Sequence, residues 1–313
     1  MATNYDVIIV GGGAAGLMCA IESGNRGRRV LVLEHANEVG KKILISGGGR
    51  CNFTNILAIP QAYLCENPRF TISPLSRFTS MDFIDLVERH GIAYHEKKLG
   101  QLFCDGSAKQ IVQMLWVECE KANVEIRTSC SITNVQHGRK QFLLATTFGP
   151  VSCDSLVVAT GGLSIPKMGA TGFAYDVARQ FGLKITETRP GLVPFTFRPP
   201  ALDMFSSLSG VSVDTSVSCG GVAWRENTLF THRGLSGPAI LQASSFWRED
   251  NTVEIDLLPD LEDAVAFFRE KRSQQQESEL AVVVSRLIPK RLALMLCEPN
   301  ASSKLSSLSN QVL

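Results

Sequence analysis

The stretch YDVIIVGGGAAGLMCAIESGNRGRRVLVLE, residues 5–34, decides the fold of this chain. It opens with a short apolar run, Val7–Val10, that is typical of a buried parallel strand. Gly11, Gly13 and Gly16 follow directly, and the next residues are rich in helix formers. The glycines are therefore predicted to lie on a strand-to-helix turn, which is the context that a dinucleotide-binding turn requires.

Each glycine has its own physical task in such a turn. Gly11 allows the tight turn, Gly13 lets the backbone approach a pyrophosphate, and Gly16 lets the helix pack against its strand. A second apolar run, Val30–Leu33, ends in Glu34, where a carboxylate would accept hydrogen bonds from a ribose diol. Strand, glycines, helix, strand and acid together predict a dinucleotide-binding unit more strongly than the glycines alone, which would also fit a turn without a ligand.

Composition limits the function classes that remain. With 313 residues, of which 44% are hydrophobic, the chain has room for two domains or for one domain with an insertion. A formal net charge of +1 gives no electrostatic case for nucleic acid or an anionic membrane surface. The expected partner is therefore a small-molecule substrate, and neither charge nor pattern predicts the oligomeric state.

The N-terminus and the cysteines predict the compartment. No apolar run approaches the roughly 18 residues of a membrane span, and the N-terminus enters a strand almost at once, which leaves no room for a signal peptide. The nine cysteines are widely spread and never form a CxxC pair, so they suggest neither a disulfide framework nor a zinc site, and no metal is expected. We expect a cytoplasmic protein whose cysteines are mostly small core residues.

The rest of the first domain reads as α/β. Residues 79–91 and 107–122 are predicted helices, the first with a capping box at Thr79 and Asp82. Four strand-like runs follow, and they predict a β-meander set into a parallel sheet: 124–127, 131–136, 141–148 and 156–159. The last run ends in Ala159-Thr160-Gly161-Gly162, where backbone amides could approach a ligand.

A proline-bearing stretch, 189–200, marks the exit from this domain. Beyond it, alternating runs predict a separate β-rich body, with strands at 211–219, 222–230 and 252–257. A helix is expected to begin near Pro238, and 277–297 is helical in pattern but broken at Pro289. The predicted domains are therefore 1–192 and 193–313, the second with a helical insert over 260–313.

A second glycine-rich stretch, Gly40–Asn55, is predicted to be a polar loop. Within it, three successive glycines at 47–49 free the backbone to turn its amides toward an anion, and Arg50 adds a cation. The alternative is a flexible surface loop. Cys51 is open to two interpretations, a redox or flavin-linking thiol and a merely adjacent one, and the sequence favours the second.

Three motifs make a resemblance specific. GKKILISGGGRCNFTN (40–55), LVVATGGLSIPKMGATGFAYDVARQFG (156–182) and LFTHRGLSGPAIL (229–241) resemble the BaiN-like family of NAD(P)/FAD-dependent oxidoreductases over almost the whole chain. The resemblance implies FAD in a Rossmann-like domain, into which a β-barrel-like domain with a helical insert is placed. Because no second GxGxxG is present, NAD(P)H is expected only as a transient electron donor.

The resemblance also implies site residues by position. Those at the pyrophosphate and ribose would be Gly11, Gly13, Ala14, Ala15, Gly16 and Glu34. Those along the flavin would be Lys42, Ser46, Gly48, Arg50, Cys51 and Asn52. Val135 would offer its backbone to the adenine, with Thr160, Gly161 and Gly162 nearby.

His232, in FTHRGLSGP, is the candidate for a side chain that acts on substrate, because imidazole titrates near neutrality. The alternative, which the sequence favours, is a histidine hydrogen-bonded within its loop. No HExxH, GxSxG or paired-carboxylate pattern supports hydrolysis.

The expected function is flavin-dependent oxidoreduction, with the protein supplying position and electrostatics. The family implies substrates such as dehydro bile acids, reduced at a carbon–carbon double bond, or aminoacetone, oxidised by oxygen. Relatives in the family continue beyond the point where this chain stops, into a segment that closes the barrel and returns to the flavin. The resemblance therefore implies a C-terminally truncated product, and two alternatives stay open: an inactive flavin- or adenine-dinucleotide-binding remnant, and an ordinary NAD-dependent dehydrogenase.

Overall fold

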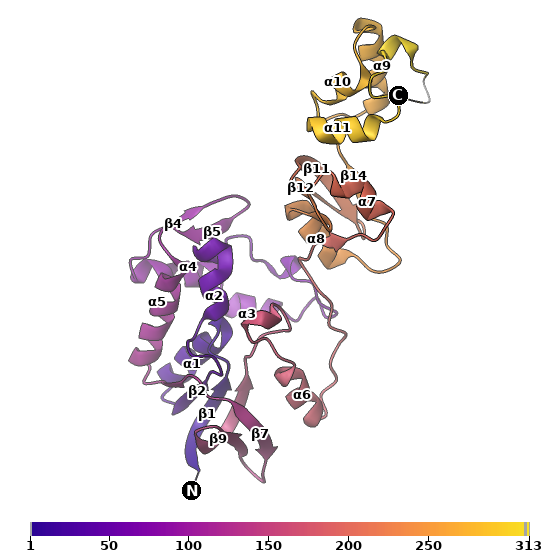
Figure 1. Cartoon of the computed structure of the whole chain (residues 1–313). Coiled ribbons are helices and arrows are strands. Elements are labelled where there is room, and N and C mark those ends of the chain that lie inside the picture. The colour runs from indigo at the N-terminus through magenta and orange to yellow at the C-terminus, as the bar shows by residue number, and fades with distance from the viewer. Residues whose placement is uncertain (1, 310–311, 313) are drawn as a thin grey trace. The chain divides into compact units, whose positions relative to one another are not determined.

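The structure, a computed structural model, describes residues 2–309 and residue 312 (Figure 1). It divides into two compact units, Met1–Thr186 and Glu187–Leu313, which we call the N-terminal and the C-terminal unit. The division falls a few residues before the domain boundary predicted from the proline-bearing stretch.

The N-terminal unit is built on a six-stranded sheet with the order β6-β2-β1-β9-β8-β7. Its strands are β1 (Thr3–Val10), β2 (Val30–Leu33), β6 (Glu125–Arg127), β7 (Ile132–His137), β8 (Phe142–Thr146) and β9 (Gly149–Val158). β1 pairs in parallel with β2 and β9, and β2 pairs in parallel with β6. β7, β8 and β9 pair antiparallel, so the predicted combination of a parallel sheet and a meander is confirmed.

One strand was assigned to the wrong part of this sheet. The run 124–127 was placed in the meander, but β6 is the parallel edge strand beside β2. The reason is the helix that precedes it, α5 (Ala108–Lys121). A strand that follows a crossover helix returns in the parallel direction, whereas a strand that follows a tight turn returns antiparallel.

Both faces of the sheet are covered. Ile9, Val30 and Val32 pack in one buried cluster with residues of α5 and of α1 (Ala14–Asn25). Ile8 and Leu31, one position away along the same strands, pack in a second cluster with the meander and with Val177 of α6 (Phe173–Gln180). This period of two explains why β1 and β2 are apolar at every position of their inner ends.

The two predicted helices of this unit are confirmed, the first of them with its predicted cap. α4 (Ser80–Arg89) begins after Thr79, whose side chain and that of Asp82 form the predicted capping box. α5 begins after Ser107, which forms a second box with Gln110.

The glycine-rich stretch 40–55 is not the loop that was predicted. It forms a short helix, α2 (Lys41–Ile45), a 3-10 turn, η1 (Ser46–Gly49), and a strand, β3 (Asn52–Asn55). β3 pairs with β5 (Gln101–Cys104), which pairs with β4 (Tyr94–Glu96). The unit also contains α3 (Ile72–Arg77) and two further 3-10 turns, η2 (Pro60–Ala62) and η3 (Pro166–Met168).

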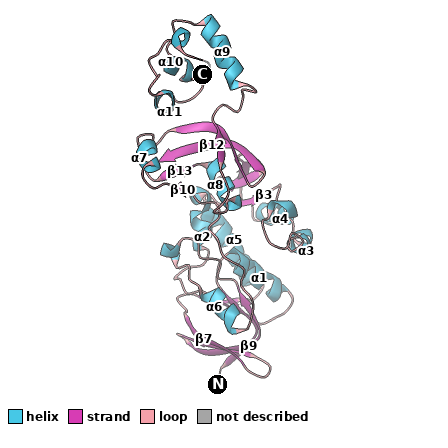
Figure 2. Ribbon diagram, turned by 90° about the vertical axis from the view of Figure 1, so that its right-hand side faces the viewer, coloured by secondary structure: helices cyan, strands magenta, loops and turns pink. Residues whose placement is uncertain are grey.

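The C-terminal unit contains a five-stranded antiparallel sheet with the order β10-β13-β12-β11-β14 (Figure 2). The strands are β10 (Phe195–Thr196), β11 (Ser212–Cys219), β12 (Val222–Thr231), β13 (Gly234–Ser236) and β14 (Glu254–Asp256). α8 (Pro238–Phe246) begins at the predicted proline and buries Ala239, Ile240 and Ala243 in the core of this sheet, beside which lies α7 (Ala201–Ser206). The predicted β-rich body is confirmed.

The last part of this unit is helical. It consists of α9 (Ala264–Gln274), α10 (Leu280–Val284), α11 (Lys290–Cys297) and a 3-10 turn, η4 (Leu305–Ser307). Pro289 separates α10 from α11, as predicted. After α11, Leu305 and Leu308 are buried in one cluster with Phe268 and Leu280.

Two general features bear on function. Within residues 2–309 and 312, no helix combines the length and the apolar character that crossing a bilayer needs. All nine cysteines are free, and seven of them are buried, which confirms that most are core residues.

Candidate functional site

The N-terminal unit contains a cavity of about 890 Å³, a volume within the range of small-molecule and cofactor sites. It lies where β1, β2 and β9 end, because Val10, Leu33 and Ala159 all line it. Eleven of the predicted site residues line this one cavity: Gly11, Gly13, Ala14, Ala15, Glu34, Lys42, Ser46, Cys51, Asn52, Thr160 and Gly161. The fold thus joins three motifs that are far apart in the sequence.

The glycine turn is held between two strands. Gly11 has a φ of +108°, and a Cβ at this position would lie 2.5 Å from the carbonyl oxygen of Ala159. Its amide donates to Leu33 O at 2.8 Å. Only glycine fits a position with this φ and this approach of neighbouring backbone, so the predicted tight turn is confirmed.

The N-terminus of α1 opens into the cavity. Gly13, its N-cap, has an extended conformation, and a Cβ there would meet no heavy atom within 4 Å. In the described part of the chain no side chain caps this helix, and its first turn carries no acidic residue. Ala14 and Ala15 of that turn line the cavity, so free amides and the positive end of the helix dipole are available to an anion.

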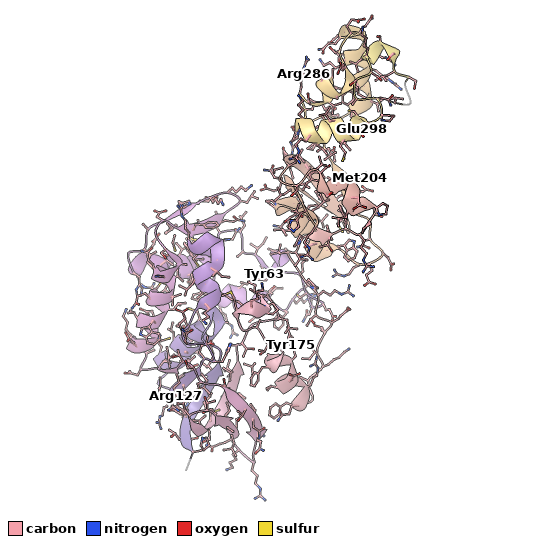
Figure 3. The ribbon with its side chains drawn as sticks, in the orientation of Figure 1. Tyr63, Arg127, Tyr175, Met204, Arg286 and Glu298 are labelled. Carbon is pink, nitrogen blue, oxygen red and sulfur yellow. The ribbon has the colours of Figure 1, made fainter. Side chains whose placement is uncertain are left out.

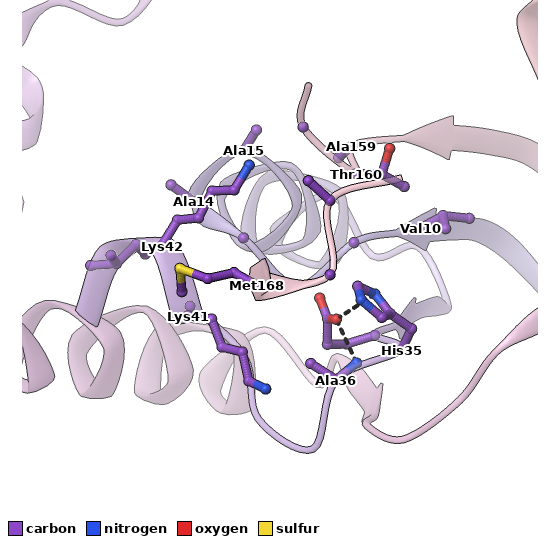
Figure 4. A pocket seen from close by; sticks show the side chains of 18 of the residues that line it. Val10, Ala14, Ala15, His35, Ala36, Lys41, Lys42, Ala159, Thr160 and Met168 are labelled. Atoms are coloured by element: carbon purple, nitrogen blue, oxygen red, sulfur yellow. Dashed lines mark hydrogen bonds and ion pairs between the residues drawn. The ribbon is translucent and has the colours of Figure 1, made fainter. Parts of the chain in front are cut away.

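Glu34 is more tightly bound than the sequence suggested. Only 8% of the residue is exposed, and its carboxylate accepts from Gly12 N at 2.7 Å and from Ala36 N at 2.8 Å. His35 Nδ1 lies 3.0 Å from one of the same oxygens (Figure 4). The carboxylate therefore fixes the glycine turn itself, and the lone pairs that remain can accept from a ribose diol.

Lys42 joins α2 to the loop after β9. Its Nζ donates to Ser164 Oγ at 2.9 Å and would lie 3.5 Å from a Cβ on Gly161. On the same loop, Thr160 Oγ1 is a buried polar atom without a hydrogen-bond partner among the described residues. A buried hydroxyl is rarely left unpaired in a finished site, so this atom is suited to a ligand.

These observations fit a flavin dinucleotide. The open space at Gly13 and the uncapped helix suit a pyrophosphate, and the carboxylate of Glu34 suits a ribose. The unpaired hydroxyl of Thr160 can both donate a hydrogen bond to a ligand and accept one. Figure 4 shows that the residues lining the cavity come from separate segments around one space. Among them are Ala14, Ala15, Lys41, Lys42, Thr160 and Met168.

Five predicted residues lie outside the cavity lining. Gly16 is a packing residue, since a Cβ there would lie 1.9 Å from Gly11 O. Gly48, Arg50 and Gly162 are exposed, and they do not line the cavity because the 3-10 turn and the loop after β9 turn them away from it. Val135 is buried within β7, and its carbonyl accepts from Gln180 Nε2 at 2.6 Å.

Near Val135, the residues that line the cavity are those at and just before the start of β7. Cys130, Ser131 and Ile132 line the cavity, because the chain passes its edge just as β7 begins. His232 lies in the exposed turn between β12 and β13 of the C-terminal unit and is not among the lining residues. Its catalytic role stays a prediction.

The segment 168–173 was missed as part of the site. Met168, Gly169 and Phe173 line the cavity, and a Cβ on Gly169 would lie 2.5 Å from His35 Nε2. The signal was present in the closely spaced glycines of KMGATGF, which allow close packing on another segment. His35 and Lys41 were also missed, because nothing in their local sequence distinguishes them from surface residues.

Cys51 lines the cavity but is a poor nucleophile. It is buried, and burial raises the pKa of its thiol, although a hydrogen bond with Ser46 acts in the opposite direction. Burial also raises the pKa of the neighbouring Cys104 to about 11. A protonated thiol neither attacks a flavin nor exchanges with a disulfide, so the structure favours the interpretation of Cys51 as an adjacent, inert thiol.

This gives a labelling prediction. We expect a thiol reagent at neutral pH to modify Cys65 rapidly in the native protein, since it is the one exposed cysteine, and to leave Cys51 unmodified until the chain is unfolded. Peptide mass spectrometry after timed labelling measures both. Cys65→Ser should remove the fast phase, and early modification of Cys51 would contradict the assignment.

Comparison with known proteins places these features in context. The HI0933-like protein Rossmann domain matches residues 5–231, and the HI0933-like protein barrel and H2TH domain matches residues 189–313. A ribosomal RNA dihydrouridine synthase of Escherichia coli is 51% identical over 290 residues, which cover 92% of this chain and 72% of the relative. A protein of the same name from Haemophilus influenzae is 45% identical over 298 residues, covering 93% and 74%.

A more distant relative is a 3-dehydro-bile acid delta(4,6)-reductase of Clostridium scindens, 26% identical over 268 residues, which cover 81% of this chain and 64% of the relative. The resemblance to BaiN-like flavoproteins is therefore confirmed at the level of the wider family, and the more specific assignment is not supported.

Proposed function

The chain belongs to the HI0933-like family of flavoproteins, and from this premise we propose that it is an FAD-dependent reductase that converts a uridine of ribosomal RNA to dihydrouridine. The observation that carries the proposal is the single cavity that joins the glycine turn, Glu34 and the Lys42–Asn52 stretch. The names of the two relatives at 51% and 45% identity support the choice of substrate.

The reaction class also agrees with the distant relative. Uracil carries a C5–C6 double bond conjugated with the C4 carbonyl, and the name of the bile-acid reductase describes reduction of double bonds conjugated with a 3-oxo group. In uracil, conjugate reduction adds a hydride to C6, the β-carbon, and a proton to C5, the α-carbon. FAD bound in the cavity would supply the hydride for this reduction, with NAD(P)H as the electron donor.

The residues of this chain have the tasks of binding and orientation. The amides at the start of α1 would hold the pyrophosphate, and Glu34, which fixes the turn, would also hold the ribose. Lys42, tied to Ser164, keeps a positive charge beside the loop that carries Thr160. A cation at this place favours the negative charge that develops on a conjugated carbonyl oxygen during reduction.

This proposal departs from the expectation of no nucleic-acid partner, which rested on the net charge of the whole chain. Net charge averages over the entire surface, and a substrate base is read mainly by contacts at the site that receives it.

The test is direct. The flavin-loaded chain is incubated with NADH or NADPH and protein-free ribosomal RNA, and the nucleosides are analysed by mass spectrometry. We expect some uridine to gain two hydrogen atoms, and we expect no product when the reduced nucleotide is left out. A different outcome would favour a small-molecule reductase. In that case no dihydrouridine forms, but NAD(P)H reduces the flavin and an unsaturated 3-oxo steroid reoxidises it.

The binding-only alternative has its own readout. Calorimetry that compares ADP with FAD separates it from the enzyme, because equal affinities would mean that the flavin ring makes no contribution. A chain that binds both equally, and whose flavin NAD(P)H does not reduce, would be a nucleotide-binding protein without turnover.

A further inference from the structure

Residues 56–81, which we call the rim segment, expose large apolar side chains. Phe70 is 72% exposed, and Tyr63 and Phe78 are 46% and 40% exposed. The aliphatic side chains of Leu57, Leu64 and Ile72 are also at least half exposed. Exposed apolar and aromatic side chains that are contiguous on a surface often mark a site where another molecule binds.

The rim segment is continuous with the cavity wall. Phe53 and Phe83 line the cavity, and their ring centroids are 6.1 Å apart. Phe83 in turn contacts Phe78 edge to face, with centroids 6.4 Å apart. One aromatic contact, between Phe83 and Phe78, therefore leads from the cavity lining to an exposed ring of the rim segment, to which Tyr63 also belongs (Figure 3).

The start of the segment is fixed by hydrogen bonds. Ile56 N donates to Gly100 O at 2.9 Å, and Asn55 Nδ2 donates to Leu99 O at 2.9 Å. The first residues of the rim segment are thus anchored to the loop between β4 and β5.

The charge of this region differs from that of the chain. The rim segment contains Arg69, Arg77 and one acidic residue, Glu66, and the stretch 41–55 before it adds three basic residues and no acidic one. Residues 41–81 thus carry a formal charge of +4 in a chain whose total is +1. Arg50, Arg69 and Arg77 are exposed, and within residues 2–309 and 312 their guanidinium groups make no ion pair or hydrogen bond. They are free to contact phosphates.

We propose that the rim segment binds single-stranded RNA beside the cavity, with Tyr63 and Phe70 as stacking platforms and Arg69 and Arg77 on the phosphates. The inference deepens the proposed function, on which its choice of partner rests. A base must leave its stack to enter a cavity, and its unstacked neighbours gain from new aromatic surfaces. Exposed rings interspersed with arginines supply this surface without reading sequence.

The experiment measures RNA affinity by fluorescence anisotropy, with the flavin-loaded full chain and a labelled oligouridine of about 12 nucleotides, a length within the range of single-strand binding sites. We expect Tyr63→Ala and Phe70→Ala each to raise Kd about tenfold, which corresponds to about 1.4 kcal/mol. In the Arg69→Ala/Arg77→Ala double variant, the dependence of log affinity on log salt should fall by about 0.7 for each arginine.

Two further variants test the stacking itself. Phe70→Tyr keeps a ring and should keep the affinity, whereas Phe70→Leu keeps apolar bulk and should lose it. Phe148→Ala is the matched control, because Phe148 is 62% exposed but lies at the turn before β9, at the opposite end of that strand from the cavity. Its RNA affinity should equal that of the parent chain, and the flavin spectrum of every variant should be unchanged.

The outcomes separate this surface from the proposed function. Dihydrouridine formation by the parent chain, with unchanged RNA affinity in the Tyr63 and Phe70 variants, would overturn the surface and leave the function. Loss of RNA affinity in those variants, in a chain that forms no dihydrouridine, would support the surface alone. If sedimentation instead showed self-association that Phe70→Ala and Phe70→Leu abolish while RNA affinity is unchanged, the segment would be an interface between copies of this chain.

Discussion

Gly16→Ala is expected to abolish flavin binding and to destabilise the protein by more than about 3 kcal/mol, the upper end of the usual cost of overpacking. The added Cβ would lie 1.9 Å from Gly11 O and 3.1 Å from Gly11 C. Both are backbone atoms of the turn, so no side chain can rotate to relieve the contact. The start of α1 would have to move from β1, and the turn that faces the cavity would be lost with it.

Gly13→Ala should separate cofactor binding from folding. Gly13 has an ordinary extended conformation and open space around its Cβ position, so the free energy of unfolding of the ligand-free chain should change by less than about 1 kcal/mol. The new methyl group lies where the pyrophosphate must approach, and we expect Kd for FAD to rise at least about tenfold.

Gly24→Ala supplies the opposite control. Its Cβ would lie 2.4 Å from Ala122 O, at the far end of α1 and outside the cavity lining. It should lower the free energy of unfolding but leave the FAD affinity of the folded fraction unchanged. Urea denaturation and FAD titration of the three glycine variants measure both quantities. Normal FAD binding by Gly16→Ala would show that the packing at this turn is not required.

Glu34→Leu is expected to lower the free energy of unfolding by about 2–6 kcal/mol, because it leaves two buried amides without an acceptor at about 1–3 kcal/mol each. These are the amides of Gly12 and Ala36, which now donate to the carboxylate at 2.7 and 2.8 Å. Such a loss is a large part of the 5–15 kcal/mol by which domains are stable at all, in order of magnitude. It should be visible in urea denaturation of the ligand-free chain.

Glu34→Gln should have an intermediate effect. The glutamine keeps one oxygen for one amide and turns its NH₂ group toward the other. Glu38→Gln is the matched control, because Glu38 lines the same cavity with an exposed carboxylate, and a surface change of this kind stays within about 0.5 kcal/mol. If the Glu34→Leu and Glu38→Gln variants had equal free energies of unfolding, Glu34 would contribute only to ligand binding and not to the stability of the turn.

Local sequence was sufficient wherever the signal depended on neighbours along the chain. The glycine turn, the capping box before α4 and the start of α8 at Pro238 were all predicted and are present. Each depends on backbone freedom or on a hydrogen bond within a few residues. The resemblance motifs added the residues of 40–55 and 159–162, most of which line the cavity.

The structure differs from the local reading of the sequence where the outcome depends on distant contacts. Val135 is a residue of β7 whose carbonyl accepts from Gln180, and it is not among the residues that line the cavity. Arg50 follows three glycines, but the 3-10 turn directs it outward. The strand 124–127 could be assigned to the parallel edge only after its pairing with β2 was known.

The sequence by itself determined that this chain forms a dinucleotide-binding α/β unit followed by a β-rich unit, because glycine spacing, apolar periodicity and caps act over short distances. Only the tertiary structure decided that Glu34 closes the glycine turn through two amides, that Lys42 is tied to Ser164, and that the exposed rings of the rim segment are continuous with the cavity wall. The bonds from Gly12 to Glu34 and from Lys42 to Ser164 join residues 22 and 122 positions apart. Such contacts depend on how the sheet and its helices pack, which no local pattern specifies.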